Sequence, residues 1–343
     1  MEEQADQAVL AIDLGGTQIR TALVTPDLRV LGRRAEPTRD EAGVEDVLRR
    51  IAEQAAAVRE AARADGWPEP IGVGISSPGP LDPWRGIVIA PPNLAGWHDV
   101  PLSDPVSEAL GLPTFLERDT NVAVMAEWRY GAAAGTRDAI YITVSTGIGG
   151  GIIVDGRPLI GRDGTAGEVG HITVELDGPL CGDGRPGHAE AIGSGTAIAR
   201  EGRALLERGG SSALAELVQD GQEVSARDVV RAAEEGDEAC QRIVDRAWEA
   251  IGALCASLVN VLNPEVIVIG GTIAKHRPDM VDVVQAEIDR RAFALPARRV
   301  SIRRPRFGDD VSLIGSLPIV NQRINDPAFG RAASASAASL ASS

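Results

Sequence analysis

Two glycine-rich turns in the sequence follow short apolar strands and carry hydroxyl side chains. They are Asp13-Leu14-Gly15-Gly16-Thr17 and Thr143-Val144-Ser145-Thr146-Gly147-Ile148-Gly149-Gly150-Gly151. Glycine permits a tight turn whose backbone N–H groups approach phosphate oxygens, and each threonine adds a hydroxyl. Asp13 is of the residue type that holds a hydrated magnesium ion. Taken alone, the first turn is explained equally well as a plain β-hairpin.

A third glycine element, Gly270-Gly271-Thr272, ends the predicted strand 265–271. None of the three matches a Walker loop, because no Gly-Lys-Ser/Thr follows. The turn at 145–150 is not a Rossmann fingerprint either, because a strand rather than a helix follows it. Separate glycine turns with hydroxyl groups indicate a nucleoside triphosphate held by more than one turn, with the nucleoside against Gly270 and Gly271.

Asp119 is the candidate proton acceptor. Phosphoryl transfer to an alcohol needs a positioned triphosphate and a group that takes the hydroxyl proton. Asp119 follows the predicted strand 114–118 at the start of the predicted helix 120–131. The competing interpretation is that Asp119 only caps this helix.

The order of predicted elements indicates an α/β fold of two lobes with a central cleft. Residues 8–34 predict a three-stranded meander, followed by a helix over 43–65 and strands at 71–76 and 114–118. Strand, glycine turn and strand recur at 140–154, so the second lobe repeats the opening of the first. The predicted domains are 1–118 joined by a terminal helix over 309–325, and 119–308. The tail 326–343 is too polar and small-residue-rich to order itself.

Composition excludes several function classes. The chain has 49 acidic and 34 basic residues and a formal charge of −15, without a basic stripe, so nucleic acid is not an expected partner. The start lacks a basic signal region, and no apolar run is long enough to cross a bilayer. Three cysteines without a disulfide pattern fit a reducing, cytoplasmic location.

An ordered set of motifs covers residues 8 to about 325. It comprises DLGGT, a proline-glycine loop at 78–80, Asn93-Leu94-Ala95-Gly96-Trp97, Glu117-Arg118-Asp119-Thr120-Asn121, TVSTGIGGG and Gly167-Glu168-Val169-Gly170-His171. Each motif is weak alone. Together, in this order and spacing, they resemble the ROK family of sugar kinases and repressors.

The resemblance implies an actin-like, ribonuclease H-like ATPase fold that binds ATP, Mg²⁺ and a hexose. It implies that Asp119 is the catalytic base. The positions that it implies for sugar binding are Gly79, Asn93, Asn121, Glu168, His171 and Glu190. Glucokinase, acting in glycolysis on the 6-hydroxyl of glucose, is the branch that the Asn93–Trp97 segment resembles most, and a homodimer or homotetramer is expected.

The sequence departs from the family at a zinc knuckle. Family members commonly have His, nine residues, Cys-x-Cys, four residues and Cys, whereas this chain has His171, Cys181, Asp183 and His188 at those positions. Aspartate and histidine are both zinc ligands, so a mixed zinc site is one interpretation. A metal-free loop held by hydrogen bonds is the other.

Two alternative functions remain at this point. The same machinery serves kinases of N-acetylmannosamine or N-acetylglucosamine, although Pro80 stands where the mannosamine kinases tend to have arginine. A sugar-responsive regulator is the alternative from another class. Such regulators carry a helix-turn-helix ahead of the first glycine turn, for which the residues before Asp13 leave no room.

Overall fold

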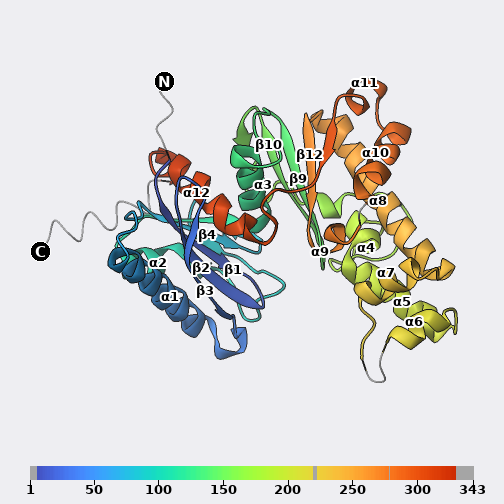
Figure 1. Ribbon diagram of the computed structural model, residues 1–343, viewed down its shortest axis with the longest axis horizontal. Helices are drawn as coiled ribbons and strands as arrows, with labels where there is room; N and C mark the ends of the chain where they lie inside the picture. The colour runs from blue at the N-terminus through green and yellow to red at the C-terminus, as the bar shows by residue number, and fades with distance from the viewer. Residues whose placement is uncertain (1–5, 219–221, 278, 330–343) are drawn as a thin grey trace, which may run out of the picture. The chain divides into compact units, whose positions relative to one another are not determined.

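The computed structural model describes residues 6–218, 222–277 and 279–329, which form two compact units (Figure 1). The first unit comprises the chain up to Ala134, Pro158–Ala166 and the chain from Phe307 onward. The second comprises Gly135–Arg157 and Gly167–Arg306. Of the predicted tail, residues 330–343 lie outside the described residues, and Pro327–Phe329 form a 3₁₀ turn.

The first unit is built on a five-stranded sheet with the strand order β3-β2-β1-β4-β8. Its strands are β1 (Val9–Leu14), β2 (Gln18–Val24), β3 (Val30–Pro37), β4 (Val73–Ser77) and β8 (Thr114–Arg118). The predicted meander is confirmed, because β1 pairs antiparallel with β2 and β2 with β3. Strand β4 lies parallel to both β1 and β8, which brings the carboxyl ends of these three strands to one edge of the sheet.

Helices cover this sheet on both faces (Figure 1). They are α1 (Val44–Ala64), α2 (Ser103–Leu110), α3 (Asp119–Tyr130) and α12 (Val311–Arg323). The apolar side chains of α1 share a buried cluster with Leu10 and Ile12 of β1. Helix α12 covers the other face, where a side chain at Gly74 would collide with Ser316. Helix α3 packs on α12, so it falls in the first unit, whereas the sequence-based boundary lay just before it.

Short strands complete the first unit. Strands β5 (Leu81–Asp82), β6 (Ile87–Val88) and β7 (Val100–Pro101) form a small antiparallel sheet. The loop between β6 and β7 carries the Asn93–Trp97 motif. Trp97 and Leu94 of this motif are buried in the unit's core, which fixes the loop against the main sheet.

The second unit has a five-stranded sheet that repeats the hairpin and the two parallel strands of the first. Its order is β11-β10-β9-β12-β13, with β9 antiparallel to β10 and parallel to β12. The strands are β9 (Ala139–Val144), β10 (Ile148–Val154), β11 (Arg157–Pro158), β12 (Val266–Gly270) and β13 (Ser301–Arg303). The predicted repeat is thus present: β1–β2 and β9–β10 are both hairpins closed by a glycine turn, with a parallel strand beside the first strand of each.

The helices of the second unit lie mainly to one side of this sheet (Figure 1). They are α4 (Ala189–Gly193), α5 (Gly195–Glu207), α6 (Ser212–Leu217), α7 (Ala226–Glu234), α8 (Glu238–Leu262), α9 (Thr272–Lys275), α10 (Met280–Arg291) and α11 (Ala294–Ala297). The long helix α8 is central, since Trp248, Ile251 and Leu254 are buried against Ile267 and Ile269 of β12. Among helices of the described residues, none has the length and apolar character needed to cross a membrane.

Candidate functional site

Asp119 stands at the junction between β8 and α3. Arg118 takes the N-cap position with extended backbone, so Asp119 is the first helical residue and not the cap. Its Oδ1 accepts the backbone N–H of Thr120 at 2.7 Å. A carboxylate in the first turn is favoured by the helix dipole, and this residue is exposed although its neighbours on both sides are buried. The structure therefore presents a charged oxygen at the carboxyl edge of the first sheet.

A buried network fixes the backbone on both sides of Asp119. Glu117 is fully buried and accepts hydrogen bonds from Arg118 N at 2.8 Å and from Asn121 Nδ2 at 2.9 Å. Its other oxygen forms an ion pair with Arg323 of α12. Asn121 itself is fully buried, and its Oδ1 has no hydrogen-bond partner among the described residues. This places the predicted sugar ligand Asn121 beneath the surface that carries Asp119.

The first glycine turn lies against the Asn93 loop. A Cβ at Gly16 would come within 2.6 Å of the carbonyl oxygen of Asn93, so only glycine fits there. Asn93 is exposed, and its neighbour Ala95 donates its N–H to Asp40 at 2.9 Å. The structure thus brings a predicted sugar-binding residue next to a predicted phosphate-binding turn within one unit.

Gly79 and Arg118 adjoin in the same unit. The aliphatic part of Arg118 lies 3.0 Å from where a Cβ of Gly79 would be, and the guanidinium donates to the carbonyl of Ala166. Any side chain at position 79 would displace Arg118, the residue directly before Asp119. The role of Gly79 is therefore steric: because it has no side chain, Arg118 can take this position next to Asp119.

The carboxylate of Asp13 forms an ion pair with Arg20. Arg20 on the adjacent strand donates from Nε to Asp13 Oδ2 at 2.9 Å, and its Nη1 reaches the carbonyl of Asp309 at 2.7 Å. The turn itself is closed by Gly15 N donating to Gln18 O at 2.9 Å. Thr17 is exposed at its tip. The hydroxyl of Thr17 is therefore open to a ligand, whereas the Asp13 carboxylate is already paired with the guanidinium of Arg20.

In the second unit, three segments meet around the β9–β10 turn. Ser145 Oγ lies 3.3 Å from Thr272 Oγ1, and Thr196 at the start of α5 donates to the carbonyl of Thr146 at 2.9 Å. Gly271 has φ +95°, and a Cβ there would lie 2.4 Å from the carbonyl of Val144. The predicted glycine turns at 145–150 and 270–271 are therefore packed together, with the amino end of a long helix beside them.

The residues at the start of α5 were not predicted. The segment Gly193-Ser194-Gly195-Thr196 carries the signal that identifies them: Ser194 caps α5 by accepting the N–H of Ala197 at 3.1 Å. The first two N–H groups of this helix, from Gly195 and Thr196, donate to the carbonyls of Ser145 and Thr146 at 2.8 and 3.2 Å, so the amino end of α5 fixes the β9–β10 turn. This helix end, like Thr272, carries a hydroxyl toward the glycine turn.

Glu190 braces the same turn. Its Oε2 accepts the N–H of Ile148 at 2.8 Å and lies where a side chain at Gly147 would be. Its Oε1 accepts from Cys181 Sγ at 3.5 Å. Predicted as a sugar ligand, Glu190 thus connects a predicted phosphate turn to the predicted metal loop.

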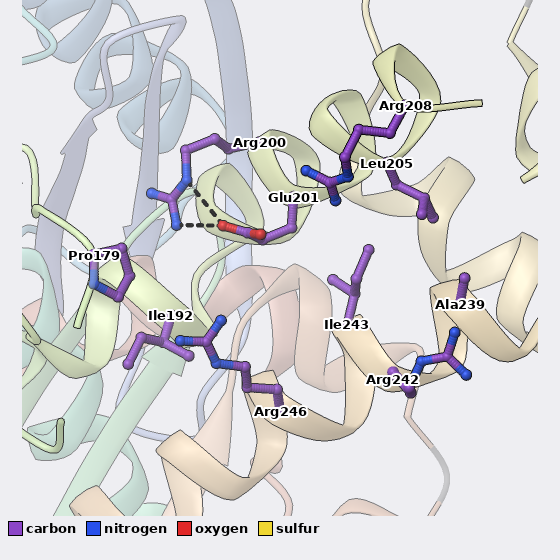
Figure 2. A pocket seen from close by; sticks show the side chains of 10 residues that line it. All are labelled: Pro179, Ile192, Arg200, Glu201, Leu205, Arg208, Ala239, Arg242, Ile243 and Arg246. Atoms are coloured by element: carbon purple, nitrogen blue, oxygen red, sulfur yellow. Dashed lines mark hydrogen bonds and ion pairs between the residues drawn. The ribbon is translucent and has the colours of Figure 1, made fainter. Parts of the chain in front are cut away.

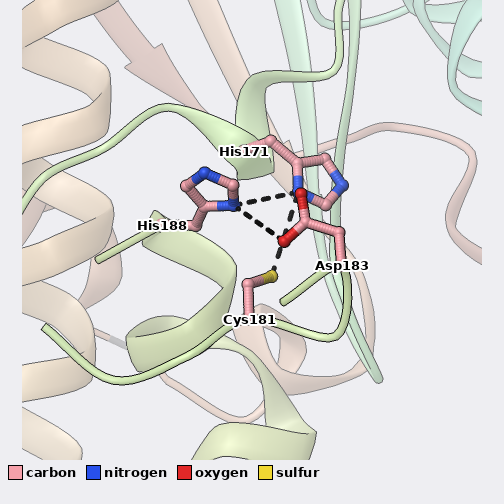
Figure 3. A group of neighbouring side chains, drawn as sticks. All are labelled: His171, Cys181, Asp183 and His188. Carbon is pink, nitrogen blue, oxygen red and sulfur yellow. Dashed lines mark hydrogen bonds and ion pairs between the residues drawn. The ribbon is translucent and has the colours of Figure 1, made fainter. Parts of the chain in front are cut away.

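The four predicted zinc ligands come together in the second unit (Figure 3). Their donor atoms all lie within 4.8 Å of one another. His171 Nδ1 is 3.2 Å from His188 Nδ1, 3.8 Å from Cys181 Sγ and 3.6 Å from Asp183 Oδ2. A tetrahedral zinc ion with ligands at about 2.0–2.3 Å separates its donor atoms by roughly 3.3–3.8 Å. The three distances from His171 Nδ1 lie in or close to this range, so these donor atoms are placed as ligands of one ion would be.

The electrostatics of this cluster also suit a cation. The backbone N–H of Arg185, together with its guanidinium, keeps the pKa of Asp183 below its ordinary value of 3.8. Burial raises the pKa of the Cys181 thiol above 9.0, so without a cation the thiol keeps its proton. A metal displaces that proton by binding the thiolate. Because His171 turns Nδ1 into the cluster, its Nε2 lies on the opposite side of the ring (Figure 3).

Exposed Glu168 immediately precedes the 3₁₀ turn η2 (Val169–His171). This turn packs tightly on β10, since a Cβ at Gly170 would lie 2.1 Å from the carbonyl of Ile148. Gly170 of the Gly167–His171 motif is thus required for the close approach of this turn to β10. It sets both Glu168 and His171 relative to the β9–β10 hairpin.

Comparison with known proteins identifies the family. The family model described as "ROK family" matches residues 9–323. This chain belongs to the ROK family. A glucokinase of Thermotoga maritima is 34% identical over 316 residues, covering 92% of this chain and 98% of that protein. An N-acetylmannosamine kinase of Citrobacter koseri is 34% identical over 271 residues, covering 78% of this chain and 83% of that protein.

A solved ROK structure has the same fold. The ROK family glucokinase from Streptomyces griseus, in complex with glucose and AMPPNP, superposes with a TM-score of 0.75 at 30% identity. The match covers 92% of this chain and 99% of that one. The predicted actin-like fold of two α/β units is therefore confirmed, as is the predicted membership of the ROK family.

Proposed function

We propose that this ROK protein is a glucokinase that transfers the γ-phosphate of ATP to the 6-hydroxyl of glucose, with Asp119 as the base. The observation that carries the proposal is the exposed carboxylate of Asp119 at the start of α3, above a fully buried Glu117. A base must reach the hydroxyl proton while its backbone stays fixed. The proposal fits the relatives, since the glucokinase of Thermotoga maritima is similar over nearly its whole length.

Asp119 would accept the proton as the hydroxyl oxygen attacks phosphorus. The oxygen–γ-phosphorus bond forms and the bond from γ-phosphorus to the bridging β–γ oxygen breaks, so ADP leaves and the sugar keeps the phosphoryl group. The exposed Asn93 and Glu168 and the ring of His171 would hydrogen-bond the other sugar hydroxyls. Buried Asn121 would contribute by holding Glu117 or by presenting its unpaired Oδ1 after a small rearrangement.

The glycine turns are the proposed ATP sites. The amide and hydroxyl groups around Gly147, Thr146 and Gly271 would bind phosphate oxygens of the nucleotide. Thr17 and the turn at Gly15 and Gly16 would bind others. Bound Mg²⁺ would neutralise charge on the triphosphate, and Asp13 is its proposed carboxylate ligand. Because Arg20 already pairs with Asp13, the ion would either replace Arg20 or bind the carboxylate beside it.

The cluster of His171, Cys181, Asp183 and His188 is proposed to hold a structural Zn²⁺. Four donors of sulfur, nitrogen and oxygen type form a closed set, which leaves the ion no open position for chemistry. Its proposed task is to fix the ring of His171 so that Nε2 faces the sugar. Zinc analysis of the purified chain, beside Cys181→Ser and a matched Cys240→Ser control, tests this. One zinc per chain, lost only in Cys181→Ser, is expected, and a zinc-free native chain that is fully active refutes it.

The activity itself is tested by coupled release of ADP with ATP and Mg²⁺. Glucose is the expected substrate, tested beside mannose, fructose, N-acetylglucosamine and N-acetylmannosamine. Asp119→Asn keeps the shape of the side chain and loses about 10²–10⁴-fold in kcat. The matched control is Asp99→Asn, an exposed carboxylate of the same unit whose side chain has no hydrogen bond or ion pair among the described residues. Turnover retained in Asp119→Asn refutes the assignment of the base.

The alternative is an N-acetylmannosamine or N-acetylglucosamine kinase. The observation that favours it is the similarity to the Citrobacter koseri enzyme over most of the chain. Activity confined to an acetylated sugar would establish it, and silence on every sugar would favour a sugar-responsive regulator. We further propose a cytoplasmic homodimer or homotetramer whose product enters glycolysis, which sedimentation of the purified chain tests in part.

A further inference from the structure

A pocket of about 310 Å³ lies in the second unit, apart from all the residues assigned above (Figure 2). It is formed mainly by α5 and α8, with contributions from α4 and from the loop before Cys181. Its lining residues are Pro179, Ile192, Arg200, Glu201, Leu205, Arg208, Ala239, Arg242, Ile243 and Arg246. The size lies at the lower end of small-molecule sites.

The charge of this pocket is opposite to that of the chain. Four of its ten lining residues are arginine and one is glutamate, whereas the whole chain carries a formal charge of −15. An acidic protein gains nothing in stability from gathering like charges at one place, because they repel one another. Four guanidinium groups around a concave surface are, in contrast, the arrangement that recognises an anion.

The existing partners of these arginines do not neutralise the pocket. Arg246 pairs with Glu175 at 2.9 Å, but both side chains are about half exposed. Arg200 donates to Glu201 at 3.0 Å, and Arg208 has no ion pair among the described residues. Pairs that water reaches are worth only about 0–1 kcal/mol, so a ligand can compete for these groups. Figure 2 shows the heads of Arg200, Arg208 and Arg246 around the carboxylate of Glu201.

The remaining lining indicates the rest of the ligand. Leu205 and Ile243 are half-buried apolar side chains among the arginines (Figure 2), and Ile192 of α4 is buried. Such surfaces suit the carbon skeleton of a small molecule, whereas a bare inorganic ion would leave them uncovered. The planar fork of arginine matches phosphate oxygens two at a time. We propose that this pocket binds a phosphorylated small molecule of sugar-phosphate size.

The proposal is tested by titration calorimetry on the full chain saturated with glucose and AMPPNP, so that any substrate site is filled. The probes are fructose 1,6-bisphosphate and glucose 6-phosphate, with free fructose and citrate as non-phosphorylated comparisons. We expect one saturable site for the phosphorylated probes, weakened by added salt. Loss of two charge-assisted contacts in Arg208→Gln/Arg246→Gln should weaken it by at least about tenfold.

The matched control is Arg227→Gln, which removes an exposed arginine of α7 in the same unit. It should bind the probes as the native chain does. The double variant should keep its melting temperature and its kcat, because its positions lie outside the substrate and metal residues. Absence of saturable binding at millimolar probe, equal binding by the double variant and the control, or tighter binding of citrate than of either phosphorylated probe overturns the proposal.

Discussion

Replacing Arg323 by methionine should destabilise the first unit more than any surface change of equal size. Arg323 is 5% exposed and Glu117 is 0% exposed, so the ion pair between them is closed to water. Arg323 also donates to the carbonyl of Leu116 at 3.0 Å and stacks on Phe329 at 4.2 Å. Arg323→Met keeps most of the aliphatic packing but leaves the Glu117 carboxylate buried without its cation.

The magnitude follows from what remains around Glu117. Two hydrogen bonds, from Asn121 Nδ2 and Arg118 N, still reach the carboxylate. Removing one partner of a buried pair costs about 3–5 kcal/mol, because the other charge stays uncompensated. At about 2–4 °C per kcal/mol for a unit of this size, the melting temperature of the first unit falls by about 6–20 °C. The double variant Glu117→Gln/Arg323→Met should recover at least half of the loss, since glutamine is neutral and still accepts from Asn121.

Differential scanning calorimetry is the assay, because two units can give two transitions and a single midpoint would blur them. The control is Arg34→Met, an exposed arginine on β3 of the same unit, which should change stability by no more than about 0.5 kcal/mol. A loss below about 1 kcal/mol in Arg323→Met refutes the reasoning. So does a double variant that is no more stable than Arg323→Met, because the cost would then come from lost packing rather than from a buried charge.

Three further predictions concern the second unit. Gly271→Ala should lower both the free energy of unfolding and the affinity for nucleotide. In the control Gly236→Ala, φ is +99° but no atom lies within 4 Å of the new Cβ, so this variant should lose only the stability that backbone strain costs. Equal losses of stability in calorimetry would contradict the steric argument. Burial raises the pKa of Cys255 to about 12, so this neutral thiol should resist a maleimide near neutral pH until denaturant is added, as peptide mapping would reveal. The hydroxyl of Ser211, followed by backbone N–H groups of α8, lowers the pKa of Asp237. The stabilisation that Asp237 gives as the cap of α8 is therefore complete above pH 3.8 and is lost as pH falls further. Asp237→Ala should lower the free energy of unfolding by about 1 kcal/mol at neutral pH, and the difference from the native chain should disappear in acid.

The local pattern of the sequence predicts most elements of the fold. Alternating β-rich runs broken by glycine predict both hairpins, and the predicted helix over 43–65 matches Val44–Ala64 of α1. The strand 114–118 is observed at those residues, and the helix after it begins at Asp119. These signals are strong because each is contained within a few residues, where turn chemistry and side-chain period act directly.

The site is predicted less completely, because its contacts join residues that lie far apart in the sequence. No local pattern indicates that Arg323 neutralises Glu117 or that Arg20 occupies the carboxylate of Asp13. Glu190 illustrates the same limit, since its role in bracing Ile148 depends on how α4 packs beside β10. The metal cluster is the exception: its spacing is visible in the sequence, and the structure brings all four residues together.

The route of the chain through the two units has a consequence for biosynthesis. Helix α12 covers one face of the first sheet, and its Gly315 fits so closely that a Cβ would lie 2.0 Å from the carbonyl of Val122. Helix α12 is synthesised only after the whole second unit, so during translation this face of the first sheet stays exposed. A nascent chain stalled before residue 311 should therefore bind chaperones through the first unit, although that unit was synthesised first.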